Sequence, residues 1–161
     1  GMSLLSGSGK VLKRQSSGGK LTMPGDEVKT AWVSHTWSKH EKPWGHEISW
    51  SSFSSGHGKI LLINKGHRTS LKFNKQKNES LLLMSGKLKV TYGDEFSLER
   101  PETHPLKTET IEVGGCLHVQ SHCPYRLEAL EDSQVIEIGN FLNDTPVRIE
   151  DDYGRSVKKN T

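Results

Sequence analysis

Short runs of apolar, or alternating apolar and polar, residues begin near residue 29 and recur as far as residue 139. Residues that favour turns, mainly Gly, Pro, Asn, Asp and Ser, separate these runs. No apolar stripe with a 3.6-residue period is longer than two helical turns, so we expect few helices. Many short strands at close spacing predict an all-β sandwich or barrel. The predicted strands are Lys29–Val33, Glu47–Phe53, Gly58–Asn64, Ser70–Phe73, Glu79–Ser85, Lys87–Tyr92, Glu95–Leu98, Thr108–Val113, Cys116–Val119, Tyr125–Ala129 and Gln134–Gly139.

The two ends of the chain differ in composition from this strand-rich region. Residues 1–28 are mainly Gly, Ser and Lys, which bury too little apolar area to offset the entropy lost on ordering, so we predict a flexible arm. Gly1 before Met2 is interpreted as a remnant of tag removal. Residues 29–161 are predicted to form one domain, as the chain length favours. The charged tail at residues 144–155 is expected on the surface or at the rim of the barrel.

Charge and cysteine content narrow the class of protein. The net charge of +3 produces no strong field for nucleic acid, so we expect no nucleic-acid partner. No apolar stretch approaches the roughly 18 residues of a membrane span and no signal peptide is visible, so we expect no membrane association. The two cysteines, Cys116 and Cys123, are too few for a disulfide framework and fit no common zinc spacing. These features predict a cytoplasmic protein.

A segment bracketed by Gly66 and Gly86 (GHRTSLKFNKQKNESLLLMSG) resembles the first sequence motif of the cupins. Cupins are small β-barrels that usually hold a metal among His, His and Glu. Set on that pattern, the motif glutamate is Glu79 and both glycines match. The two positions that the resemblance assigns to metal-binding His hold Asn74 and Gln76 instead. Amide side chains are poor ligands for the transition metals that imidazole binds.

Three further segments resemble one group of cupins, the type II mannose-6-phosphate isomerase domains. Residues 41–47 (EKPWGHE) are similar to the Lys/Arg-Pro-Trp-Gly opening of these domains, and residues 68–71 (RTSL) to their Arg-x-Ser-Leu. Residues 148–155 (RIEDDYGR) are similar to the closing Arg-x-Glu-Asp-x-Tyr-Gly-Arg. The segments occur in the family's order and cover about residues 41–155. The resemblance implies an all-β cupin double-stranded β-helix, a jelly-roll barrel, that acts in carbohydrate metabolism.

The second cupin motif lies at residues 114–129 (GGCLHVQSHCPYRLEA). Family members place a metal-binding His where this chain has Tyr125. Three imidazoles are therefore replaced, by Asn74, Gln76 and Tyr125, and only Glu79 remains of the usual ligands. Because neutral imidazole nitrogens hold zinc, nickel or iron, we expect no bound metal and no other cofactor.

A metal site rebuilt from other donors is the alternative. Cys116, His118 and His122 share one face if the strand that contains them alternates regularly. Their spacing matches no familiar metal-binding pattern, and Pro124 indicates that the strand is already turning there.

Glu79 and Tyr125 are the predicted catalytic residues. Aldose–ketose isomerisation needs a base that moves a proton between adjacent carbons and an electrophile that stabilises the enediolate. Glu79 is the candidate base and Tyr125 the candidate acid. In the family that the chain resembles, the metal supplies the electrophile; without it, a cation would have to polarise the substrate carbonyl.

Basic side chains near the motifs predict a binding site for an anion. Arginine offers a forked, permanently charged donor that suits phosphate or carboxylate. We expect Arg68 and Lys72 to hold a phosphate group. The alternative for Arg148 and Arg155 is that they pair with the acidic residues 150–152 and pin the tail. The predicted substrate-binding residues are Arg68, Lys72, Asn74, Gln76, Arg126 and Arg155.

These observations favour a mannose-6-phosphate isomerase-like cupin that binds or isomerises a phosphorylated sugar. Whether it is an enzyme stays open at this point. One alternative is a non-catalytic cupin that binds a sugar or nucleotide sugar, and another is a structural or regulatory dimer without a ligand. The expected partners are a small-molecule sugar phosphate or nucleotide sugar. We also expect a homodimer, because pairing covers exposed strand edges.

Overall fold

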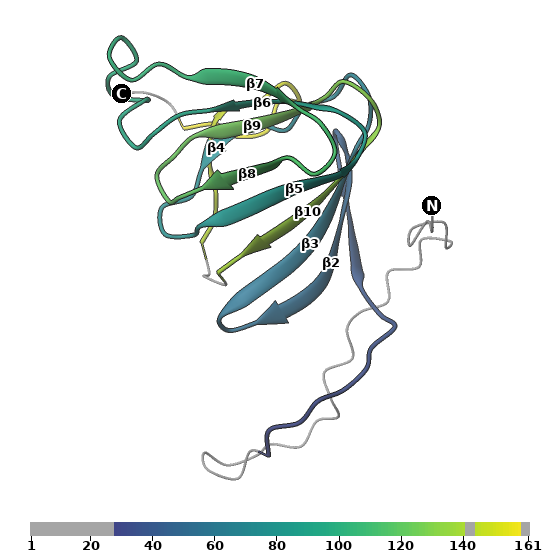
Figure 1. Cartoon of the computed structure of the whole chain (residues 1–161). Helices are drawn as coiled ribbons and strands as arrows, with labels where there is room; N and C mark the ends of the chain where they lie inside the picture. Colours follow the sequence, from purple (N-terminus) through teal and green to yellow (C-terminus); the bar gives the residue numbers. More distant parts are fainter. Residues whose placement is uncertain (1–27, 141–143, 159–161) are drawn as a thin grey trace.

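Two antiparallel sheets face each other in the structure, a computed structural model that describes residues 28–140 and 144–158. The sheets approach closely at one end of the barrel and separate at the other (Figure 1). In the described ranges the regular elements are strands, and no helix there is long and apolar enough to cross a membrane. The predicted all-β barrel is confirmed. The predicted arm at residues 1–28 lies, except for Val28, outside the described residues.

The larger sheet contains six strands in the order β1-β2-β3-β10-β5-β8. A hairpin joins β1 and β2, and the Pro-Trp-Gly segment forms its turn. Trp44 of this segment points into the core, where 4% of its surface remains exposed. The strands are β1 Ser38–Lys42, β2 Gly45–Phe53, β3 Gly56–Ile63, β5 Glu79–Ser85, β8 Cys116–Val119 and β10 Ser133–Gly139.

The smaller sheet contains five strands in the order β11-β4-β9-β6-β7. From β3 to β6 and again from β8 to β11, consecutive strands alternate between the two sheets, as in a jelly-roll barrel. This route brings side chains from distant parts of the sequence into one interior. The strands are β4 Leu71–Phe73, β6 Leu88–Tyr92, β7 Lys107–Ile111, β9 Tyr125–Ala129 and β11 Val147–Glu150.

Two predicted strands are wrong and two strands were missed. Lys29–Val33 has an apolar alternation but lies outside the sheets, and Glu95–Leu98 forms turns in which the Asp94 carboxylate accepts a hydrogen bond from the Phe96 amide. The missed strands are the polar edge strands Ser38–Lys42 and Val147–Glu150. These two segments become strands because they pair with β2 and β4 through backbone hydrogen bonds, and a hydrophobic pattern does not reveal such pairing.

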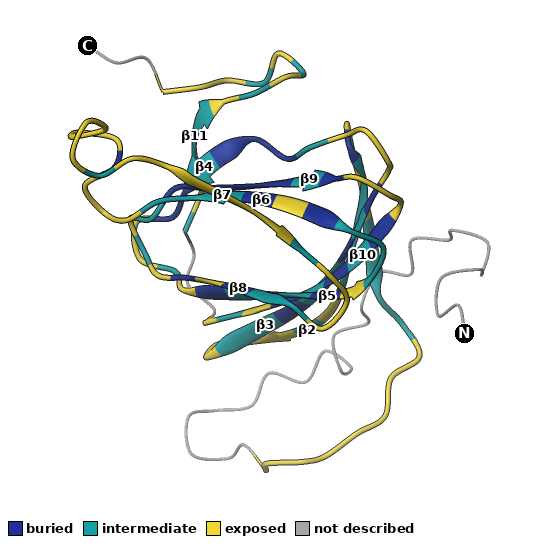
Figure 2. Cartoon of the chain, turned by 45° about the horizontal axis from the view of Figure 1, so that its top comes forward, coloured by how far each residue is buried: buried dark blue, intermediate teal, exposed yellow. Residues whose placement is uncertain are grey.

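Inward-facing positions change from apolar to charged along the barrel. In β5 the buried residues are Leu83, Leu81 and then Glu79, and in β10 they are Ser133, Val135 and then Glu137. Leu83 and Val135 are cross-strand neighbours with no exposed surface, and buried residues recur along strands of both sheets (Figure 2). The apolar end forms the hydrophobic core. The charged end leaves a polar cavity.

The outer face of the larger sheet is also apolar. In β3, β5 and β10 the apolar runs are continuous, so residues pointing away from the core are Ile60, Leu82 and Ile136 as well as the exposed Met84 and Ile138. Continuous apolar runs are typical of strands covered on both faces. Segment 28–37 extends beyond the barrel and also exposes apolar side chains (Figure 1).

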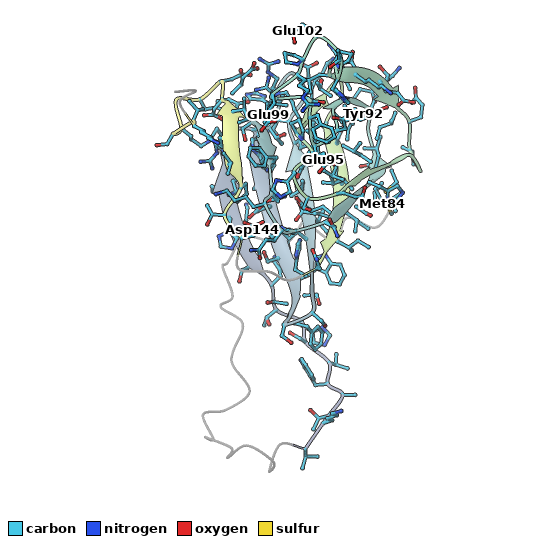
Figure 3. The ribbon with its side chains drawn as sticks, turned by 90° about the vertical axis from the view of Figure 1, so that its left-hand side faces the viewer. Met84, Tyr92, Glu95, Glu99, Glu102 and Asp144 are labelled. Atoms are coloured by element: carbon cyan, nitrogen blue, oxygen red, sulfur yellow. The ribbon has the colours of Figure 1, made fainter. Side chains whose placement is uncertain are left out.

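We therefore expect a second copy of the chain to cover this face. Met84→Glu, which places a charge on the outer face (Figure 3), should convert a wild-type dimer to monomer in light scattering coupled to gel filtration. Val113→Glu is the matched control, because Val113 is also apolar and exposed (61%, against 48% for Met84) but lies in the turn between β7 and β8. A wild-type chain that stays monomeric at high concentration would contradict the prediction.

Candidate functional site

A cavity of about 190 Å³ lies at the charged end of the barrel. Both sheets contribute to its walls, because β2, β3, β5 and β10 come from one and β4 and β11 from the other. Six of its lining residues are Lys or Arg and three are Glu, so positive charge predominates. The lining residues are Lys42, Trp44, Glu47, Lys59, Ser70, Lys72, Lys77, Glu79, Glu137, Pro146, Arg148 and Arg155.

Lys72 and Arg148 form an unusual pair in this wall. They are direct cross-strand partners between β4 and β11, and both line the cavity. Like charges placed opposite each other in a sheet are destabilising. In the described part of the chain, neither side chain has a carboxylate within ion-pair distance, although Lys72 lies 5.7 Å from the ring centre of Tyr125. Burial lowers the pKa of Lys72, since desolvation disfavours its charged form.

Glu79 lies at the centre of a buried hydrogen-bond network. Its Oε1 atom accepts a hydrogen bond from Asn74 Nδ2 and another, 3.1 Å long, from the Tyr125 hydroxyl. Burial and the nearby carboxylates raise the pKa of Tyr125 well above its ordinary value, so its hydroxyl stays protonated and donates. Asn74 Oδ1 is a buried acceptor without a hydrogen-bond partner in the described ranges.

Glu137 of β10 is the second carboxylate of the network. Its Oε2 atom lies 2.8 Å from His57 Nε2, and the Lys77 ammonium lies 3.9 Å away. Burial alone would raise the pKa of Glu137, but the hydrogen bond from His57 and the charge of Lys77 outweigh it and lower the pKa to about 2. Burial and the charge of Glu137 raise the pKa of Glu79. The two carboxyl groups thus differ in protonation: Glu137 is the ionised member and Glu79 the one that gains a proton more easily.

The ligand positions that the cupin resemblance implies do not fit a metal ion. Asn74 and Tyr125 use their polar hydrogens to donate to Glu79, and the Gln76 side chain is exposed at the surface. None of these residues offers the imidazole nitrogen that transition metals prefer. In the described residues a different group, His57, Glu79 and Glu137, brings three donor atoms within 4.8 Å of one another.

The structure unites only some of the residues predicted from the sequence. Lys72, Glu79 and Arg155 line the cavity. Asn74 and Tyr125 do not line it, but both donate hydrogen bonds to Glu79. Gln76 does not line it; the loop turns its side chain outward while its backbone amide donates to Asp144. The predicted roles of these residues remain predictions.

Arg68 and Arg126 lie outside the cavity, in contact with the closing segment. Arg68 Nη2 donates to Asp152 Oδ1 at 2.8 Å, and Arg126 donates to the Thr69 carbonyl and to Glu150. The segment is therefore pinned mainly by arginines of the barrel, not by its own Arg148 as the alternative interpretation had it. Arg155 does pair with a tail acid, Asp151 Oδ1, at 2.7 Å, while also lining the cavity.

The proposed replacement donors in the second motif do not converge. His118 Nδ1 lies 2.8 Å from Ser80 Oγ and 3.9 Å from Cys116 Sγ on the outer side of the larger sheet. His122 has a positive φ of 67°, is exposed, and stacks on Phe73 of the other sheet. The turn that Pro124 predicted thus separates His122 from the other two residues.

Sequence reasoning did not single out His57, Lys59, Lys77 or Glu137. A signal existed for Glu137, because it follows the buried Val135 by two positions in an apolar run and must therefore face inward. The same spacing relates Lys59 and His57 to Leu61 in β3. Lys77 lies in the loop before β5, where no periodicity applies.

Solved structures at low sequence identity share this architecture. KdgF from Halomonas sp. aligns with a TM-score of 0.53 and 15% identity over 66% of this chain and 87% of its own length. CapF from Staphylococcus aureus aligns with a TM-score of 0.53 and 14% identity over 66% and 29% of the two chains. A variant of oxalate decarboxylase from Bacillus subtilis gives 0.54 and 15% over 65% and 27%. These proteins are cupins.

The chain has the cupin fold. It spans most of the KdgF cupin but less than a third of the CapF and oxalate decarboxylase chains. No protein-family model and no curated protein matches its sequence. The resemblance to mannose-6-phosphate isomerase domains therefore remains a prediction within the cupin fold.

Proposed function

We propose that this cupin binds the anionic group of a small sugar, such as a sugar phosphate, between Lys72 and Arg148. The observation that carries the proposal is their cross-strand pairing in the cavity wall, where neither side chain has a carboxylate of the described residues within ion-pair distance. Like charges placed opposite each other repel, and an anion between them would accept a charge-assisted hydrogen bond from each. Arg155, whose guanidinium is already oriented by Asp151, supplies a third cationic group.

The size and polarity of the cavity favour a monosaccharide phosphate. Its volume of about 190 Å³ is below the ~300–1,000 Å³ typical of sites for drug-sized ligands, which argues against a nucleotide sugar. Glu47, Glu79 and Glu137 supply acceptors for hydroxyl groups, and Trp44 supplies an apolar surface beside them. The similarity to CapF, described as a capsular polysaccharide assembling protein, supports a sugar ligand.

Isomerisation of the bound sugar is the second candidate function, and the carboxylate pair favours it. Two carboxyl groups whose surroundings move their pKa values apart are suited to donate and accept protons in turn. Glu79, the base in the prediction from the sequence, would here act as the acid, and Glu137 as the base, when a proton moves between adjacent carbons. Tyr125 then positions Glu79 through its hydrogen bond and does not itself transfer a proton to the sugar.

Calorimetric titration should show that wild type binds mannose 6-phosphate or glucose 6-phosphate and not uncharged mannose. Arg148→Ala should weaken binding by roughly ten- to a hundredfold, because a hydrogen bond to a charged group is worth about 1.5–3 kcal/mol. Arg148→Lys should restore part of the affinity, because an ammonium lacks the planar fork.

Arg100→Ala is the matched control and should bind as wild type does, since Arg100 lies at an exposed loop position outside the cavity. Wild type that binds no sugar phosphate would contradict the proposal, as would equal losses in the two alanine variants. If Glu79→Gln abolishes turnover of a bound sugar phosphate but leaves its affinity unchanged, isomerisation is supported. Binding without turnover in wild type would identify a non-catalytic binder.

A further inference from the structure

We propose that the Lys77 ammonium is a built-in cation for the carboxylate pair and prevents a divalent metal from binding to His57, Glu79 and Glu137. Lys77 Nζ lies 3.6 Å from Glu79 Oε2 and 3.9 Å from Glu137 Oε2. One positive charge therefore faces both carboxylates at once. Among the described residues, His57, Glu79 and Glu137 are the group that could hold a metal ion, and the Lys77 ammonium lies beside two of them.

The position of Lys77 is defined by the fold. Its backbone amide donates to Asp144 Oδ2 at 3.2 Å, and the neighbouring amide of Gln76 donates to the same atom (Asp144 is labelled in Figure 3). Its side chain is 13% exposed, while those of Glu79 and Glu137 are 3% and 7% exposed. The ammonium is therefore held in a largely enclosed site.

Charge explains why a cation is needed there. Two carboxylates that approach within 4.8 Å in a buried site repel each other unless a positive charge lies nearby. A divalent ion or an ammonium can both supply that charge. Because Lys77 is part of the chain, it is present at every metal concentration, and a metal would have to displace it.

A lysine in this position also has a chemical consequence. It lines the cavity, so its ammonium can donate a hydrogen bond to an oxygen of a bound ligand while it contacts the carboxylates. Positioned cations stabilise developing oxyanions in the same way as a metal does. Lys77 balances the charge of the carboxylates whichever ligand occupies the cavity.

Mn²⁺ binding tests the proposal, since this ion suits carboxylate and imidazole donors and binds thiolates poorly. Wild type and Lys77→Arg should bind Mn²⁺ weakly in calorimetry. Lys77→Met, which keeps the aliphatic stem, should bind one Mn²⁺ at least about tenfold more tightly, because a unit charge about 4 Å away is removed from two carboxylates. Mn²⁺ should also raise the melting temperature of Lys77→Met more than that of wild type.

Adding His57→Gln to Lys77→Met should abolish the gain in Mn²⁺ affinity, and Lys75→Met, at an exposed neighbouring position, should not produce it. The proposal is overturned if wild type binds one Mn²⁺ through His57 as tightly as Lys77→Met does. It is also overturned if folded Lys77→Met gains no affinity, or if Lys77→Arg gains as much. If Lys77→Met does not fold, Lys77→Gln replaces it as the neutral variant, and tight Mn²⁺ binding by wild type still overturns the proposal. Titration of wild type with a sugar phosphate tests only the proposed function, so the Mn²⁺ results and the sugar-phosphate results can fail independently.

Discussion

Acid is expected to destabilise the wild-type chain more than Glu137→Gln, by up to about 3 kcal/mol between pH 5 and pH 2. The pKa of Glu137 is lowered from 4.5 to about 2 in the folded chain, and one pKa unit corresponds to about 1.4 kcal/mol. A lowered pKa stabilises the folded state above the unfolded pKa, and this contribution is lost as the pH falls towards the folded value. Gln keeps the shape and an acceptor for His57 but does not titrate.

Glu79 acts in the opposite direction and makes the stated difference an upper limit. Its pKa is raised, so its contribution to stability is present at low pH and is lost as the pH rises through its folded pKa. Part of that rise comes from the charge of Glu137, which the substitution removes. Urea unfolding at several pH values measures the difference between the two proteins. Glu102→Gln, at an exposed loop position (Figure 3), should follow wild type throughout.

An equal pH dependence in wild type and Glu137→Gln would show that His57 and Lys77 do not stabilise the ionised carboxylate. That result would also weaken the assignment of different proton affinities to the two glutamates. Native-state titration by NMR then offers an independent check, because it follows each carboxyl group separately.

The barrel could be predicted because its strands carry their own signal. Tyr125–Ala129 alternates strictly and Glu79–Ser85 contains a continuous apolar run; both are bounded by turn residues, and the structure has them at the same limits. Polar edge strands lack that signal. β11 is a strand because it pairs with β4. Its sequence, VRIE, has only two apolar residues, which is too short a pattern to predict a strand.

The cavity was harder to predict because the identity of its lining residues depends on pairing between segments that are distant in the sequence. Arg68 and Lys72 are close in sequence and both basic, yet Asp152 holds Arg68 at the surface while Lys72 faces the interior. Arg148 enters the wall through its register with Lys72, which is set by a strand that the hydrophobic pattern did not show. The inward-facing positions of apolar strands could in principle have been predicted from the sequence, as the position of Glu137 shows.

Two glycines of the sequence motifs, Gly45 and Gly66, both have a positive φ but differ in what surrounds them. Gly45 of the Pro-Trp-Gly segment has a φ of +149°, and an added Cβ would lie 1.9 Å from the backbone oxygen of Leu62. That oxygen belongs to the neighbouring strand β3 and cannot move without disturbing the sheet. Gly66 also has a positive φ, +83°, but nothing lies within 4 Å of the position of its Cβ.

Gly45→Ala should therefore lower the free energy of unfolding by at least about 3 kcal/mol, since backbone strain of about 1–3 kcal/mol adds to the contact with Leu62. Gly66→Ala should cost only the roughly 1–2 kcal/mol of the left-handed conformation. The difference between the two variants in urea unfolding gives the free-energy cost of the contact with the Leu62 oxygen. Equal losses would mean that strand β3 yields at Leu62. Since Trp44 precedes Gly45 and is buried in the core, such a shift would also appear in the fluorescence of the folded protein.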